Sequence, residues 1–212
     1  MIDLENKSFC IFGLNDSGKS TLANYILQQF GEAAFVYDIM NEYRDGPYDR
    51  YVPSDRKSGL EFETVLRAVM TSRRYRLILI DEANRFCPSK PHPLPQAIAD
   101  LNDWRAHWGL ATGYIARLPV QLNQDLTQLA HYLFIFRIPG IQSTDYLNDI
   151  SAGLGDTSLA LDKYHFVVAD AERRYTVFKP IPRQFATNKG IGTKLSKTPS
   201  GGVNLDSSAP GA

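Results

Sequence analysis

Residues 13–20 read G-L-N-D-S-G-K-S, with Thr21 next, and this stretch decides the fold. It matches the pattern G-x-x-x-x-G-K-[ST] at every fixed position. An apolar run at 9–12 precedes it, and a helix-like pattern at 19–30 follows it. A strand, a glycine-rich turn and a helix in this order are typical of a loop that binds phosphate groups. An ordinary glycine-rich turn is the alternative, and the two flanking elements argue against it.

Each fixed position of this loop has a chemical reason. Gly13 and Gly18 let the backbone curl until successive N–H groups point at a phosphate, next to the positive end of a helix dipole. Lys19 supplies a point charge for the β- and γ-phosphates, and Ser20 supplies a hydroxyl for Mg²⁺. The sequence therefore predicts an ATP·Mg²⁺ site. Its candidate nucleotide-binding residues are Gly13, Asn15, Asp16, Ser17, Gly18, Lys19, Ser20 and Thr21.

A second motif consists of the apolar run L-I-L-I at 77–80 and the two carboxylates after it, Asp81 and Glu82. We expect Asp81 to hold Mg²⁺ through its water shell. Glu82 can polarise a water molecule in line with the γ-phosphate, which makes it the candidate catalytic base. Any strand must end in polar residues, so the pair alone is weak, and the loop at 13–20 gives it weight. Because a nucleotide kinase does not need this glutamate, the motif favours an ATPase.

The rest of the chain alternates short apolar runs with helical patterns, which indicates an α/β fold around a mostly parallel sheet. The predicted strands are 9–12, 34–38, 77–80, 110–116 and 132–136, with a C-terminal β-hairpin at 164–169 and 174–178. The predicted helices are 19–30, 60–71, 94–107, 122–130 and 144–151. We expect one ATPase domain over residues 1–185. Residues 186–212 are rich in Gly, Ser, Thr, Pro and Ala and are predicted to be a disordered tail.

Composition limits the functional classes. The 212 residues carry no net charge, which argues against a broad basic face for nucleic acid. No run approaches the roughly 18–20 apolar residues of a membrane span. The start of the chain lacks the pattern of a secretory signal, and its two cysteines suit a reducing compartment. Residues 171–212 hold seven basic and two acidic side chains, which predicts a solvated basic segment or a contact with phosphates.

Several later stretches resemble the FtsK–HerA superfamily of DNA-pumping ATPases. They are I-D-E-A-N-R-F at 80–86, W-R-A-H-W-G-L at 104–110, A-R-L-P at 116–119, L-F-I-F-R at 133–137 and D-I-M-N-E-Y at 38–43. The resemblance covers roughly residues 8–180, and the order and spacing of the motifs give it weight. It implies a P-loop NTPase sheet with strand order 5-1-4-3-2, flanked by helices. The small chain is similar to the packaging ATPases of membrane-containing icosahedral viruses.

That likeness implies partners as well as an activity. It implies ATP hydrolysis coupled to translocation of duplex DNA by a homo-oligomeric ring, typically a hexamer. A capsid vertex or portal protein is a further candidate partner, and no membrane span is expected. The implied location is the cytoplasm of a host cell, or association with the virion.

Two positions depart from the family pattern. Arg117 stands where the family usually has a sensor Gln, so it is a candidate for stabilising charge at the γ-phosphate. The family places an Arg at position 106, which is Ala106 here, and Arg105 lies one residue earlier. Arg105 is therefore a candidate for the arginine that reaches a neighbour's site, and Arg85 and Arg137 compete with it.

Two other functional classes remain open. The first is a filamentous-phage assembly or secretion ATPase, a class that usually carries a transmembrane segment. The second is a nucleotide-operated switch or partitioning protein, in which hydrolysis changes partner binding. The loop at 43–59 mixes tyrosines with Arg44 and Arg50, which could stack on DNA or simply pack under the loop. The basic cluster at 73–76 is interpreted as a solvated corner.

Overall fold

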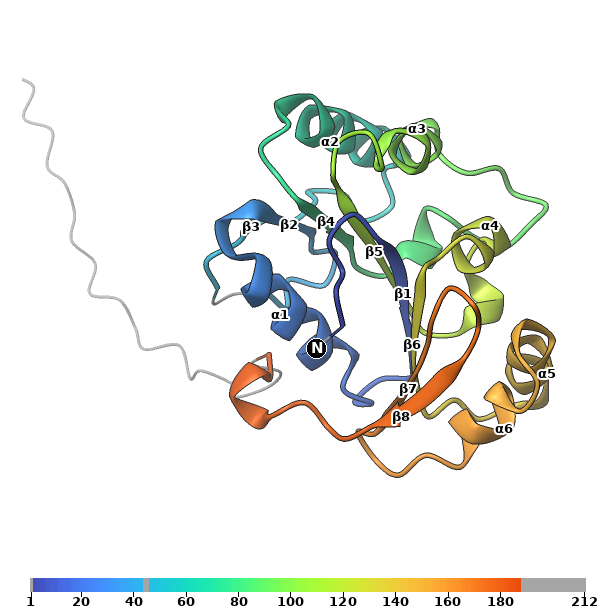
Figure 1. The fold of residues 1–212 in the computed structure, drawn as a ribbon. Coiled ribbons are helices and arrows are strands. Elements are labelled where there is room, and N and C mark those ends of the chain that lie inside the picture. The colour runs from blue at the N-terminus through green and yellow to red at the C-terminus, as the bar shows by residue number, and fades with distance from the viewer. Residues whose placement is uncertain (1, 44–45, 188–212) are drawn as a thin grey trace, which may run out of the picture.

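The computed structural model describes residues 2–43 and 46–187, and it centres on an eight-stranded sheet (Figure 1). The strands lie in the order β3-β2-β4-β5-β1-β6-β7-β8. The pairs from β3 to β6 are parallel, and β7 and β8 are antiparallel additions at one edge. The strand bounds are β1 Ser8–Phe12, β2 Ala34–Tyr37, β3 Asp49–Tyr51, β4 Leu77–Ile80, β5 Ala111–Ala116, β6 Tyr132–Phe136, β7 Phe166–Ala169 and β8 Tyr175–Phe178.

This topology confirms the predicted fold class. The five core strands predicted from the sequence are β1, β2, β4, β5 and β6, and their neighbours follow the expected order 5-1-4-3-2. The predicted C-terminal hairpin is formed by β7 and β8. The structure adds β3, a three-residue edge strand inside the stretch that was predicted to be a polar loop. It pairs in parallel with β2 through the register Phe35↔Asp49 and Tyr37↔Tyr51.

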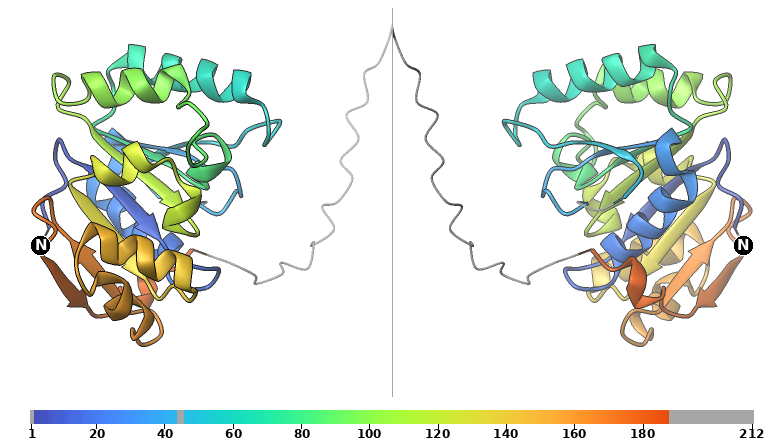
Figure 2. Two further views of the ribbon diagram at one scale, coloured as in Figure 1. Left: turned by 90° about the vertical axis from the view of Figure 1, so that its right-hand side faces the viewer. Right: turned by 90° about the vertical axis from the view of Figure 1, so that its left-hand side faces the viewer.

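Helices cover both faces of the sheet, but unequally (Figures 1 and 2). Helix α1 covers one face, where its buried residues pack among those of β1, β2 and β6. The other helices pack on the opposite face. The helix bounds are α1 Lys19–Phe30, α2 Gly59–Ser72, α3 Gln96–Trp104, α4 Gln124–Gln128, α5 Ile141–Ile150 and α6 Leu154–Leu159. Short 3₁₀ helices are η1 Gly31–Ala33, η2 Ala83–Arg85, η3 Pro119–Gln121 and η4 Arg183–Phe185.

The central strands are apolar because they are covered on both sides. All residues of β1, β2, β4 and β5 are buried, as expected for parallel strands between two helix layers. Phe9 and Phe12 of β1 face opposite sides of the sheet and are fully buried. Burial of such a side chain contributes about 1.5–3 kcal/mol to stability. The sheet is therefore a rigid support for the loops that leave its strand ends.

The strands β1, β2, β4 and β5 are parallel, so their carboxyl ends lie together along one side of the sheet. The functional motifs follow these carboxyl ends. In the part of the chain that the structure describes, no helix is long and apolar enough to cross a membrane. The predicted domain limit at residue 185 stays a prediction, and residues 188–212 of the predicted tail lie outside the described residues.

Candidate nucleotide site

The stretch 13–20 forms a tight loop between the end of β1 and the start of α1. Gly18 caps α1 in a left-handed conformation with φ of 110°. A Cβ added to Gly13 would lie 2.8 Å from Cβ of Phe136, a separation that real Cβ atoms do not adopt. Both glycines are thus required by the path of the backbone. The curled loop leaves the N–H groups at the start of α1 available for an anion.

Two contacts fix the loop. The Lys19 ammonium donates a hydrogen bond to the carbonyl oxygen of Leu14 at 2.8 Å, so its side chain folds back over the loop. The Gly13 N–H donates to the carbonyl oxygen of Arg117 at 3.1 Å, which ties the loop to the segment that leaves β5. The hydroxyl of Ser17 is buried and has no hydrogen-bond partner within residues 2–43 and 46–187. A phosphate oxygen would satisfy it, so the loop fits the predicted ligand.

The remaining predicted nucleotide-binding residues follow from this path. Asn15 and Asp16 lie exposed at the tip of the loop, and Asp16 has a left-handed φ of 59°. Thr21 is half-buried in the first turn of α1. The predicted set therefore lies on this loop and the first turn of α1.

The part of the site where we expect Mg²⁺, around Asp81 and Ser20, is strongly acidic. Asp81 is buried at the end of β4, and burial first, then the charges of Glu42, Glu82 and Asp38, raise its pKa to about 7. A cation beside these carboxylates would reverse this effect. Ser20 lies in the same region, and its hydroxyl donates to Oε2 of Glu42 at 2.8 Å.

This oxygen-rich set fits Mg²⁺. The ion prefers oxygen ligands and keeps several waters beside one or two protein groups and the substrate phosphates. Within the described ranges, no group of three or more His, Cys, Asp or Glu side chains is arranged to hold a metal ion.

The candidate base, Glu82, lies next to the candidate charge stabiliser, Arg117. The Arg117 Nε donates to Oε1 of Glu82 at 3.2 Å. The side chain of Glu82 is 13% exposed and that of Arg117 is 41% exposed, so solvent screens the pair and its net stabilisation is about 1 kcal/mol or less. Glu82 itself has a left-handed φ of 45°, which turns the chain from β4 into η2. The structure thus unites two predicted residues that lie 35 positions apart.

Arg105 lies near the amino ends of the strands, opposite the carboxyl ends that carry the phosphate loop. Its Nη1 donates to the carbonyl oxygen of Asn6 at 3.0 Å, just before the start of β1, and its Nη2 lies 3.5 Å from Nδ1 of His131. Burial lowers the pKa of its guanidinium. It is therefore remote from the phosphate loop of its own chain. The competing candidates Arg85 and Arg137 are exposed and follow β4 and β6.

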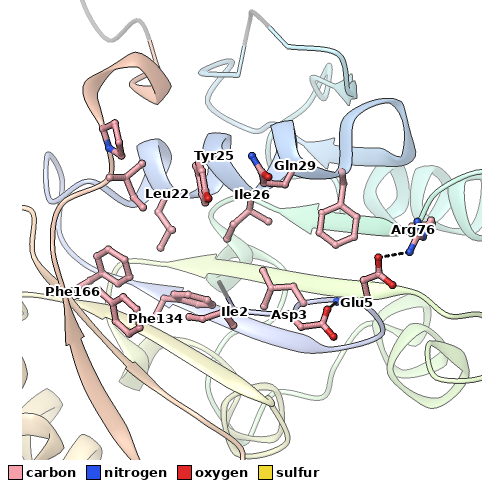
Figure 3. Close-up of a pocket in the computed structure, with 15 residues that line it drawn as sticks. Ile2, Asp3, Glu5, Leu22, Tyr25, Ile26, Gln29, Arg76, Phe134 and Phe166 are labelled. Atoms are coloured by element: carbon pink, nitrogen blue, oxygen red, sulfur yellow. Dashed lines mark hydrogen bonds and ion pairs between the residues drawn. The ribbon is translucent and has the colours of Figure 1, made fainter.

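A separate hollow of about 650 Å³ lies between α1 and the sheet (Figure 3). Apolar side chains dominate its lining, including Leu22 and Ile26 of α1 and Phe134 and Phe166 of the sheet (Figure 3). The ion pair between Arg76 and Glu5 lies at one end. Its lining includes no residue of the phosphate loop, Asp81 or Glu82, so we assign it no part in the candidate chemistry.

Glu42 was not among the residues predicted for the site. The motif D-I-M-N-E-Y at 38–43 was part of the family resemblance, but it gave this glutamate no role. The contact between Glu42 and Ser20 depends on how the end of β2 packs beside α1. Sequence spacing alone does not reveal it.

Comparisons with known proteins support the fold. No protein-family model and no curated protein matches the sequence. Among solved structures, the genome packaging NTPase B204 of Sulfolobus turreted icosahedral virus 2, in complex with AMPPCP, matches with a TM-score of 0.71 at 19% identity. That match covers 85% of this chain and 100% of the other. The ATP-gammaS complex of the same NTPase matches with a TM-score of 0.70 at 20% identity, covering 84% and 98% of the two chains.

A more distant match extends the comparison. The N-terminal domain of zonular occludens toxin from Neisseria meningitidis matches with a TM-score of 0.53 at 13% identity, covering 84% of this chain and 96% of that domain. At such identities these likenesses establish a shared fold. The fold agrees with the resemblance that the sequence motifs predicted.

Proposed function

We propose that this chain is an ATPase of the FtsK–HerA type that moves duplex DNA, and that it packages a viral genome. One observation carries the enzymatic part: the glycine-rich loop, Asp81 and Glu82 converge at one edge of the sheet. Each is of the residue type that nucleotide hydrolysis needs, and the loop has the curvature that binds phosphates. The fold shared with the genome packaging NTPase B204 supports the motor part.

The loop binds the nucleotide. N–H groups at the start of α1 donate to the β-phosphate, where the helix dipole adds positive potential. Lys19 moves its ammonium from the Leu14 carbonyl to the β- and γ-phosphates, a more strongly charged pair of acceptors. Ser20 and Asp81 are the residues that would hold Mg²⁺, and the bound ion would neutralise charge on the phosphates.

Glu82 supplies the base. Its carboxylate accepts a proton from a water molecule aligned with the γ-phosphate. Arg117 holds this carboxylate at 3.2 Å, so the side chain is restrained before nucleotide arrives. The backbone carbonyl of Arg117 accepts a hydrogen bond from the Gly13 N–H, so this residue follows β5 beside the loop, and its guanidinium is our candidate to turn towards the γ-phosphate.

The assembly is a homo-oligomeric ring, a hexamer by analogy with the family. In it Arg105, at the far edge of one chain, completes the site of the next chain. A ring grips DNA with a few contacts repeated around its pore, so a chain with no net charge is compatible with this function. A capsid vertex or portal protein would be the docking partner, in the host cytoplasm or on the virion.

The test is the rate of ATP hydrolysis with and without duplex DNA, measured over a range of protein concentrations. We expect DNA to stimulate the rate, and the rate per chain to rise with protein concentration as rings form. Lys19→Ala should abolish nucleotide binding. Glu82→Gln should bind ATP as the wild type does, yet turn it over about 10²–10⁴-fold more slowly.

One outcome would contradict the motor, and another would contradict the role of Glu82. A rate that is indifferent to DNA but stimulated by a protein partner would identify a nucleotide-operated switch. Unchanged turnover in the Glu82→Gln variant would remove Glu82 from the mechanism.

A further inference from the structure

A third acidic residue reaches the part of the site where we expect Mg²⁺. The hydroxyl of Ser20 donates a hydrogen bond to Oε2 of Glu42 at 2.8 Å. Glu42 follows β2, the strand that lies next to β4, and the Asp81 N–H donates to the Tyr37 carbonyl at 3.1 Å where the two strands end. Because β2 and β4 are neighbours, Glu42 and Asp81 both lie at the carboxyl ends of the strands, and Ser20 at the start of α1 contacts Glu42 there.

The turn that carries Glu42 is built to hold it there. The buried carboxylate of Asp38 accepts hydrogen bonds from the N–H groups of Glu42 and Tyr43, at 2.9 Å and 3.0 Å. Arg50 binds Asp38 at 3.4 Å and the side-chain oxygen of Asn41 at 2.6 Å. Asn41 takes a left-handed φ of 57°, which closes the turn. Because the backbone is fixed at both N–H groups, the side chain of Glu42 starts from a defined place.

Electrostatics agree with this geometry. After burial, Glu42 is the charge that most raises the pKa of Asp81, ahead of Glu82. The phenol of Tyr43 is fully buried beside the same groups, and burial followed by the charges of Asp81, Glu42 and Asp38 raises its pKa. Several carboxylates thus lie close together around the buried Asp81.

We propose that Glu42 is a positioning residue for the metal: it accepts the Ser20 hydroxyl proton and so directs the free lone pairs of that hydroxyl at Mg²⁺. A hydroxyl has one proton to donate and two lone pairs to offer, so a fixed acceptor on one side determines what faces the other. The carboxylate also adds negative charge to the surroundings of the ion beside Asp81, as partners of metal ligands commonly do. The inference rests on the proposed function, because it needs a site that takes Mg²⁺ with its nucleotide.

The test separates Mg²⁺ affinity from nucleotide affinity. Binding of a fluorescent ATP analogue is measured by titration in excess EDTA, and then as a function of Mg²⁺ at fixed nucleotide. We expect Glu42→Gln to raise the Mg²⁺ concentration at half-saturation about 10–100-fold, the usual effect of losing a partner of a metal ligand. Binding in EDTA should stay within about twofold of wild type, and high Mg²⁺ should restore turnover in the variant.

Controls distinguish positioning from a loss of fold. Glu32→Gln removes one exposed carboxylate from η1 and should leave Mg²⁺ dependence unchanged. Glu42→Asp keeps the charge but shortens the reach to Ser20, so it should also weaken Mg²⁺ binding. In a Ser20→Ala background, Glu42→Gln should have little further effect, since two residues that act together are not additive.

Different outcomes would contradict different parts of this proposal. Wild-type Mg²⁺ dependence in Glu42→Gln, or an equal loss of binding with and without EDTA, would overturn the role of Glu42 and leave the proposed function intact. Full additivity with Ser20→Ala would overturn the path through the hydroxyl. A wild-type chain that binds no nucleotide at all would overturn the proposed function, and the role of Glu42 with it.

Discussion

Replacing Asp81 by Asn should stabilise the metal-free protein while it weakens Mg²⁺ binding. Asp81 has an ordinary pKa of 3.8, and burial with the charges of Glu42, Glu82 and Asp38 raises it to about 7 in the folded chain. The folded state therefore binds this proton more tightly than the unfolded state does. Above pH 3.8 the unfolded chain releases the proton first, so the folded state is progressively penalised as pH rises, until Asp81 ionises in both states above pH 7.

The size of the penalty follows from the two pKa values. A difference of about three pKa units corresponds to about 4 kcal/mol, the full cost above pH 7. At pH 5 only the interval between pH 3.8 and pH 5 contributes to the penalty, which gives roughly 1–2 kcal/mol. An Asn at this position carries no charge and still accepts from the backbone. For a domain of this size, 1 kcal/mol moves the melting temperature by roughly 2–4 °C.

The measurement is thermal unfolding in EDTA at pH 5 and pH 8, for wild type and Asp81→Asn. We expect the variant to melt higher at both values, with the larger difference at pH 8. Glu32→Gln controls for removal of one exposed carboxylate. With Mg²⁺ and ATP added, the order should reverse, because only the wild type gains from the ion. A variant that is less stable than wild type at pH 8 without metal would refute the assigned cause of the pKa shift.

Three further substitutions test the site. Gly13→Ala should cut nucleotide affinity at least about tenfold and lower the melting temperature, because its Cβ would lie 2.8 Å from that of Phe136; Gly59→Ala, which has open space, is the calorimetric control. Arg117→Gln should change stability by about 1 kcal/mol or less but slow single-turnover hydrolysis about tenfold or more, and equal single-turnover rates would exclude a role at the γ-phosphate. Arg105→Ala should be inactive alone, and mixing it with Glu82→Gln chains should restore part of the hydrolysis; full activity of Arg105→Ala alone would exclude it.

The sheet could be predicted where local pattern and long-range pairing agree. The apolar run at 77–80 predicted a covered strand, and the turn before Tyr175 separates the two segments that form the hairpin. The edge strand β3 escaped prediction because its three residues lie in a polar stretch between prolines, and only its parallel pairing with β2 makes it a strand. Helix α6 escaped because it is six residues long and contains Gly155, a weak helix former.

The candidate site also has a part that the sequence predicted and a part that it did not. The loop at 13–20 and the pair Asp81 and Glu82 each form a local motif, so the sequence predicted their common position at the edge of the sheet. The contacts of Ser20 with Glu42, and of Glu82 with Arg117, join residues from different strands. These contacts depend on side-chain direction after folding, which spacing does not encode. The same limit applies to Arg105, whose remoteness from its own loop became visible only in three dimensions.

The placement of Arg105 and Glu82 at opposite ends of the strands restricts how copies of this chain can share a site. If Arg105 is shared through a head-to-tail contact, as proposed, the side of one chain that carries Arg105 meets the side of the next chain that carries Glu82. In an open row of such contacts, the first or last member always lacks its complement. When such a row closes into a ring, every chain both provides an arginine and receives one. Such an assembly is polar, with unlike front and back, and this asymmetry would give movement along DNA a direction.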